Sequence, residues 1–162
     1  MKRVNARALV LSLFIVYLVA FIGSLFSSAS VNSQWYNSVK PSITPPNWVF
    51  PVVWNILFLF IAVSLYLSWT AKTKTKKESK RNRIKIAVVF GINLLLNTLW
   101  SFLFFTLHSP VVSFYELVAL EISIFAMMFI TYRIRKAAAL ILIPYALWIV
   151  FAGILNYIIA FH

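Results

Sequence analysis

The sequence contains no cysteine and no aspartate, and only three of its 162 residues are acidic: Glu78, Glu116 and Glu121. The absence of cysteine excludes disulfides, thiolate metal sites and cysteine nucleophiles. The absence of aspartate, with histidine only at His108 and His162, leaves no hydrolytic triad, phosphate-binding loop or metal-ligand spacing. We therefore expect no metal site and no conventional acid–base or metal-dependent catalysis.

Charged residues of both signs are scarce, at 11% of the chain, whereas a soluble domain carries about 25%. Apolar residues make up 62%, and the net charge is +12. An excess of this kind suggests nucleic-acid binding when it is spread along a polar face. Here eight of the fifteen Lys and Arg fall between Lys72 and Lys85. This clustering favours a membrane protein without a nucleic-acid partner.

Five apolar segments are each close to the ~20 residues that cross a hydrocarbon core of about 30 Å. Continuous apolar runs satisfy their backbone hydrogen bonds in lipid as helices, and they lack the alternation of barrel strands. The sequence predicts an all-α membrane protein, a single five-transmembrane-helix bundle over residues 1–162. The first segment could instead be a cleaved signal, although it is longer than a signal's apolar region. The expected helices are 8–26, 48–69, 86–107, 111–132 and 137–161.

The basic residues predict how the helices are oriented. Five spans bring three basic stretches to one side of the membrane: Lys2, Arg3 and Arg7, the loop between the second and third helices, and the turn at 133–136. Only Lys40 falls on the other side. We expect a multi-pass protein of the cell membrane, surrounded by lipid, with a cytoplasmic N-terminus and an outer C-terminus.

The connection over residues 27–47 is long and stiff. Four of the six prolines lie between Pro41 and Pro51, and proline restricts both its own backbone and that of its predecessor. Trp35 and Tyr36 belong to the same connection. It is a candidate lid, although aromatic residues resting at the membrane interface explain the composition equally well.

Two tryptophans lie deep in predicted helices. Trp54 is about two turns into the second helix, and Trp148 is near the middle of the fifth, one turn after Pro144, which should kink that helix. Ala152 and Leu155 continue the face of Trp148. Buried indoles suit a flat hydrophobic ligand with a polar fringe, but simple helix packing is the alternative.

Polar residues at membrane depth form a second group of candidates. Asn93, Asn97 and Trp100 share one face of the third helix, where the amides could bond across helices or to a ligand. Glu116 and Glu121 lie inside the fourth helix, about 140° apart at 100° per residue, so they do not form a paired-carboxylate site. They are either proton-relay groups or polar contacts within a bundle or dimer.

Three stretches resemble the TspO/MBR family, the tryptophan-rich sensory and translocator proteins, also called peripheral benzodiazepine receptors. They are WYNSVKPSITPPNWVFPVVWN (35–55), LNTLWSFLFF (96–105) and LIPYALWIVFAGILNY (142–157). Their order and spacing match the family, and the resemblance covers essentially the whole chain.

The resemblance implies a five-helix bundle with a ligand cavity open towards the connection between the first two helices. Family members bind porphyrins such as protoporphyrin IX and haem, as well as benzodiazepine-type and isoquinoline ligands. Some bacterial members degrade protoporphyrin in light, and this implies a photochemical role for Trp148, with Trp54 as its partner. The implied pocket residues are Tyr36, Trp54, Asn93, Asn97, Trp148 and Ala152, and the additional lining is Trp48, Phe58, Trp100 and Leu155.

The resemblance further implies a homodimer and a porphyrin held as a ligand rather than as a tightly bound cofactor. Animal members bind cholesterol through a motif with Lys or Arg shortly after the position of Tyr157. The residues that follow here, 158–162, contain neither, so we expect a prokaryotic membrane and no such sterol motif. The leading function is tetrapyrrole sensing, sequestration, transport or light-dependent degradation. The alternatives are a proton-coupled transporter of amphipathic molecules using Glu116 or Glu121, and a scaffold subunit.

Overall fold

The computed structural model describes residues 5–162, and all regular secondary structure in that range is helical. Five spans are long and apolar enough to cross a membrane, counting α4 with η1 and α6 with α7 as one span each. This confirms the predicted fold class. The elements are α1 (Ala6–Ser28), α2 (Gln34–Val39), α3 (Val49–Trp69), α4 (Lys76–Ser101), the π-helical η1 (Phe102–Thr106), α5 (Pro110–Ile134), α6 (Lys136–Leu140) and α7 (Ile143–Phe161).

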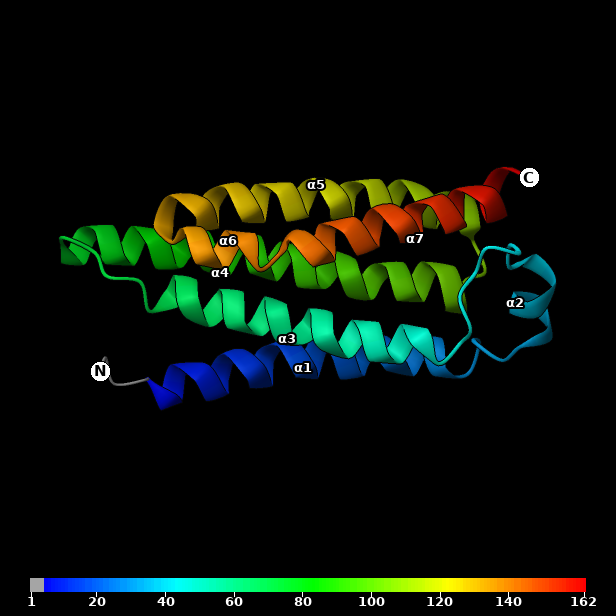
Figure 1. Ribbon diagram of the computed structural model, residues 1–162, viewed down its shortest axis with the longest axis horizontal. Helices are drawn as coiled ribbons and strands as arrows, with labels where there is room; N and C mark the ends of the chain where they lie inside the picture. Colours follow the sequence, from blue (N-terminus) through cyan, green and yellow to red (C-terminus); the bar gives the residue numbers. More distant parts are fainter. Residues whose placement is uncertain (1–4) are drawn as a thin grey trace.

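The long helices run side by side along the longest axis of the molecule (Figure 1). Helix α1 packs on α3 and α4, and α5 packs on α4 and α7, whereas α3 and α7 touch little. The short helix α2 lies at one end of the bundle, near the C-terminus. The α3–α4 connection and the α5–α6 turn lie at the opposite end, with the start of α1 (Figure 1).

The outside of the bundle is as apolar as its core. Ile61 and Tyr145 are fully buried, yet Leu95 and Leu147 on the periphery are 73% and 66% exposed. A soluble protein rarely exposes contiguous apolar surface on this scale. Lipid covers such side chains without penalty, and helices leave no backbone group unpaired within it. The exposed apolar faces therefore agree with a multi-pass membrane protein.

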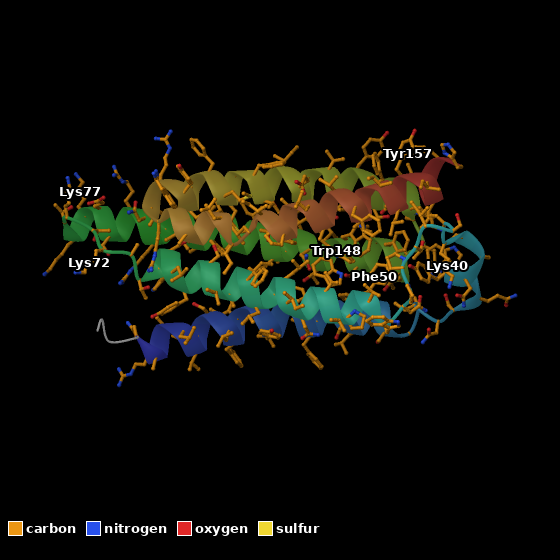
Figure 2. The ribbon with its side chains drawn as sticks, viewed as in Figure 1. Lys40, Phe50, Lys72, Lys77, Trp148 and Tyr157 are labelled. Atoms are coloured by element: carbon orange, nitrogen blue, oxygen red, sulfur yellow. The ribbon has the colours of Figure 1, made fainter. Side chains whose placement is uncertain are left out.

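The basic segments gather at one end of the bundle. Lys72 and Lys77 lie at the end opposite Lys40 (Figure 2). The first turn of α1 and the last turn of α5, which carry further basic residues, lie at the same end as these two lysines. Lys2 and Arg3 lie outside the described residues. The clustering agrees with the predicted topology, while the side of the bilayer that this end faces remains a prediction.

Helix α4 begins at Lys76, well before the predicted start at residue 86, so that boundary was wrong. The hydroxyl of Thr75 accepts a hydrogen bond from the Glu78 backbone N–H at 3.1 Å, and the Glu78 carboxylate accepts one from the Lys74 N–H at 2.9 Å. These bonds satisfy N–H groups that a helix start leaves unpaired. Apolar content marks only the lipid-covered part of a helix, and the basic turns lie beyond it.

The predicted helix 137–161 is divided into α6 and α7 just before Pro144, as the expected kink requires. The Leu142 carbonyl accepts hydrogen bonds from the N–H groups of Tyr145 and Ala146 at 3.0 and 3.1 Å. The Ser64 hydroxyl of α3 donates to the Ala138 carbonyl at 2.7 Å. This bond attaches α6 to α3, and the break sets the direction in which α7 leaves.

Candidate functional site

A cavity of about 670 Å³ opens inside the bundle at the α2 end. Its walls come from α1, α3, α4, η1 and α7, and the connection between α1 and α3 covers it. Helices α3 and α7 separate here, which is why they make few contacts elsewhere. The lining is mainly aromatic and aliphatic, as in most small-molecule sites.

The structure gathers all but one of the predicted ligand-binding residues around this cavity. Asn93 is the exception, because it is fully buried and does not reach the lining. The residues that do line it are Tyr36, Trp48, Trp54, Phe58, Asn97, Trp100, Trp148, Ala152 and Leu155. Whether they contact a ligand remains a prediction.

Trp54 and Trp148 are held in opposite walls by other aromatic rings. Trp54 of α3 stacks on Phe58 with centroids 5.3 Å apart. Trp148 of α7 meets Phe50 of α3 edge to face at 5.9 Å (Figure 2). Within residues 5–162 neither indole N–H has a hydrogen-bond partner, and since an indole N–H normally finds one, both are available to a ligand.

Trp100, by contrast, is fixed by a hydrogen bond. Its Nε1 donates to Asn156 Oδ1 at 3.1 Å, and Asn156 Nδ2 donates to the Pro110 carbonyl at 2.7 Å. The Trp100 ring also stacks on Phe104 at 5.2 Å. This chain connects α4, α7 and the start of α5 and keeps one cavity wall rigid.

The two amides of α4 belong to a buried network beneath the cavity. The Tyr145 hydroxyl donates to Asn93 Oδ1 at 3.2 Å and accepts from Asn97 Nδ2 at 3.1 Å. Asn93 Nδ2 donates to Ser123 Oγ of α5 at 2.8 Å. Asn93 therefore bonds between helices, one of the two roles open to it from sequence, while Asn97 both bonds Tyr145 and lines the cavity.

The α1–α3 connection is tied down over the cavity mouth. The Ser30 hydroxyl donates to the Phe105 carbonyl at 2.9 Å, and Asn47 Nδ2 donates to the Val31 carbonyl at 3.3 Å. Trp35 stacks on His108, with ring centroids 4.1 Å apart. The connection thus has a fixed structure that covers the cavity, which favours the lid over a purely interfacial role.

Two lid residues carry polar groups. Tyr36 is buried against Phe104 and Phe105, and burial raises the pKa of its phenol, so that it stays neutral at physiological pH. The Thr44 hydroxyl is buried in the cavity lining without a hydrogen-bond partner. Buried hydroxyls are usually bonded, so Thr44 is free to bond a ligand.

Sequence reasoning missed several lining residues. Helix α1 contributes Ala20, Gly23, Ser24 and Ser27, small residues at helical spacing that could have been recognised as a face allowing close approach. Phe104 also lines the cavity but lies in a π-helical turn, whose altered register a regular 3.6-residue pattern does not predict.

Glu116 and Glu121 lie outside this cavity. Both oxygens of each carboxylate are buried without a hydrogen-bond partner. Glu116 is 9% exposed and points into the bundle, while Glu121 lines a shallow groove of about 320 Å³ between α5 and α7, alongside Gly153. The two carboxylates therefore share no site, as their angular separation predicted.

Comparison with known proteins agrees with this architecture. Residues 12–162 match the TspO/MBR family. The chain is 37% identical to the tryptophan-rich protein TspO of Archaeoglobus fulgidus over 156 residues, 96% of each chain. It is 37% identical to that of Chlorobaculum tepidum, covering 98% of this chain and 96% of the relative, and 30% identical to the Homo sapiens translocator protein, covering 85% and 79%. With the same five-span fold and matches along nearly its whole length, the chain belongs to the TspO/MBR family of membrane proteins.

Proposed function

We propose that this protein binds porphyrins, such as protoporphyrin IX or haem, and other flat hydrophobic molecules in the cavity beneath the α1–α3 connection. The observation that carries the proposal is the aromatic cavity itself. Its volume of about 670 Å³ lies within the roughly 300–1,000 Å³ of small-molecule pockets. Bound there, the porphyrin is a ligand rather than a permanent cofactor.

The distribution of polar atoms supports a tetrapyrrole over a wholly apolar ligand. A porphyrin has a flat apolar ring and carboxylates along one edge. Trp54 and Trp148 offer flat faces to the ring, and Thr44 and Asn47 offer polar atoms at the lid end. The carboxylate edge therefore faces the lid, where its hydration is least disturbed, because burying an unpaired charge costs much more than burying the ring.

The protein's role beyond binding follows from what happens to the bound porphyrin. Sensing, sequestration and transport require only binding and release, and the human relative is named a translocator protein. Light-dependent degradation requires in addition a side chain that reacts with the photoexcited ligand, a role that we assign to Trp148 with Trp54.

Titration of the purified protein with protoporphyrin IX tests the binding proposal. Tryptophan emission should be quenched and should reach saturation at a fixed stoichiometry, because four of the six tryptophans line the cavity: Trp48, Trp54, Trp100 and Trp148. N-Acetyltryptophanamide in the same detergent controls for absorption of light by the porphyrin. Quenching no greater than that control would reject the proposal.

We also propose that the protein lies in the cell membrane with its basic end in the cytoplasm, since cytoplasmic loops carry excess Lys and Arg. The chain has no cysteine, so a single introduced one reports its own exposure. Lys40→Cys should react with an impermeant maleimide on intact cells, and Lys76→Cys only after lysis. The reverse pattern would invert the topology.

A second candidate function is proton-coupled transport of amphipathic molecules. The observation that favours it is the pair of buried carboxylates, Glu116 and Glu121, without hydrogen-bond partners, because ionisable groups at membrane depth are costly and commonly serve proton or ion movement. If this function is correct, Glu121→Gln should abolish uptake driven by a pH gradient in proteoliposomes. Glu78→Gln, at the start of α4, is the matched control; equal uptake by both variants excludes Glu121.

A further inference from the structure

A second, shallower pocket of about 430 Å³ lies at the opposite end of the bundle, where α3 ends and α4 begins. It is separate from the aromatic cavity and shares no lining residue with it. Its upper part is basic and its lower part apolar. The lining residues are Trp69, Lys76, Ser79, Lys80, Arg83, Ile84 and Ala87.

The three cations of this pocket form one row along α4. Lys76, Lys80 and Arg83 are spaced at i, i+4 and i+7, which places them on one face, over a length of about 10 Å at ~1.5 Å per residue. The Arg83 guanidinium lies over the Trp69 ring, 5.5 Å from its centroid. This contact connects the row to the end of α3.

No carboxylate lines the pocket. Glu78 is the acidic residue closest along the chain, but its carboxylate accepts the Lys74 N–H and its own N–H donates to Thr75, at the start of α4. The row therefore has no anionic side chain in its own pocket to neutralise it. A bound anion would supply that charge.

The apolar part of the pocket lies on the membrane side of the cations. Ile84 and Ala87 follow Arg83 along α4 towards the bilayer centre, and both are exposed. Trp69 stands beside them, and tryptophan favours the interface between head groups and hydrocarbon. A ligand that fills the pocket must combine an anionic head with an apolar chain directed into the membrane.

We infer that this pocket binds an anionic phospholipid of the surrounding membrane. The phosphate head group lies along Lys76, Lys80 and Arg83, and one acyl chain lies over Ile84 and Ala87. Basic pockets between transmembrane helices recognise anionic lipid head groups through this chemistry. A free phosphate ion would leave the apolar part uncovered, so the lipid is the better match.

Native mass spectrometry tests this inference on the full chain, with equimolar phosphatidylglycerol and phosphatidylcholine added to the detergent-solubilised protein. Wild type should retain phosphatidylglycerol preferentially. The triple variant Lys76→Gln/Lys80→Gln/Arg83→Gln should lose that preference by on the order of tenfold or more, because each basic residue contributes to the attraction. The control Lys72→Gln/Lys74→Gln/Lys77→Gln removes the same charge from residues outside the pocket and should keep it. Equal loss in both variants would mean general electrostatic attraction and would overturn the site.

Two further measurements distinguish the lipid from other anions. Ala87→Phe fills the apolar part while leaving every charge in place, and because Ala87 is exposed the fold should tolerate it. This variant should also lose phosphatidylglycerol. Inorganic phosphate should not displace the lipid from wild type. Retention by Ala87→Phe, or displacement by phosphate, would show an anion site without a lipid chain and would refute the inference.

Discussion

Trp148→Phe is expected to abolish the light-dependent loss of bound protoporphyrin IX while changing its dissociation constant by less than about threefold. Phenylalanine keeps a flat apolar face against Phe50, 5.9 Å away, and Phe151, 5.5 Å away. It lacks the electron-rich indole that a photoexcited porphyrin could oxidise. A threefold change in affinity corresponds to about 0.6 kcal/mol, a plausible cost for losing part of one ring.

The measurement is the decay of porphyrin absorbance under illumination, with a dark sample as reference. Trp69→Phe is the matched control, because Trp69 lies at the basic end of the bundle and does not line the cavity; it should decay like wild type. Trp54→Phe should give an intermediate rate if Trp54 is the partner of Trp148. Equal decay in wild type and Trp148→Phe would remove the photochemical role and leave the binding proposal standing.

Ala152→Phe should weaken porphyrin binding by on the order of 100-fold, a loss of about 2.7 kcal/mol. Ala152 lies one turn after Trp148 and lines the cavity, so a benzyl group there would occupy the space assigned to the ring. Overfilling a packed interior typically costs about 1–3 kcal/mol, and a rigid macrocycle has few ways to avoid the clash.

Isothermal titration or tryptophan quenching with Ala119→Phe provides the comparison. Ala119 lies on the exposed face of α5 and lines none of the described pockets, so the added ring should extend into lipid or detergent. That variant should bind porphyrin like wild type and unfold at the same temperature. Affinity within threefold of wild type for Ala152→Phe would show that the ligand lies elsewhere.

The positions of the spanning helices followed directly from the sequence. Apolar runs of about 20 residues have one stable arrangement in lipid, and α1, α3 and α5 start and end within a few residues of the predicted bounds. The position of Pro144 also predicted the break between α6 and α7, because proline cannot donate the hydrogen bond that would continue the helix. The prediction of these features required no knowledge of distant contacts.

The start of α4 and the presence of α2 were not predicted. Both elements lie outside the apolar runs, where hydropathy carries no information. Their starts depend on side-chain capping: Thr75 accepts the Glu78 N–H, and Ser33 accepts the Tyr36 N–H at 3.2 Å. Such short polar signals are common in loops as well as at helix starts, so they specify a helix only where the surrounding structure supports it.

The sequence by itself determined that the chain crosses a membrane five times, that its basic segments share one end, and, through family motifs, which residues would surround a cavity. Only the tertiary structure decided that Asn93 bonds Tyr145 and Ser123 instead of lining that cavity, that small residues of α1 complete its wall, and that a basic pocket lies at the far end. The physical reason is that hydropathy and helical spacing are local properties of a chain. The direction in which a buried amide points depends on which neighbouring helix supplies its hydrogen-bond partner.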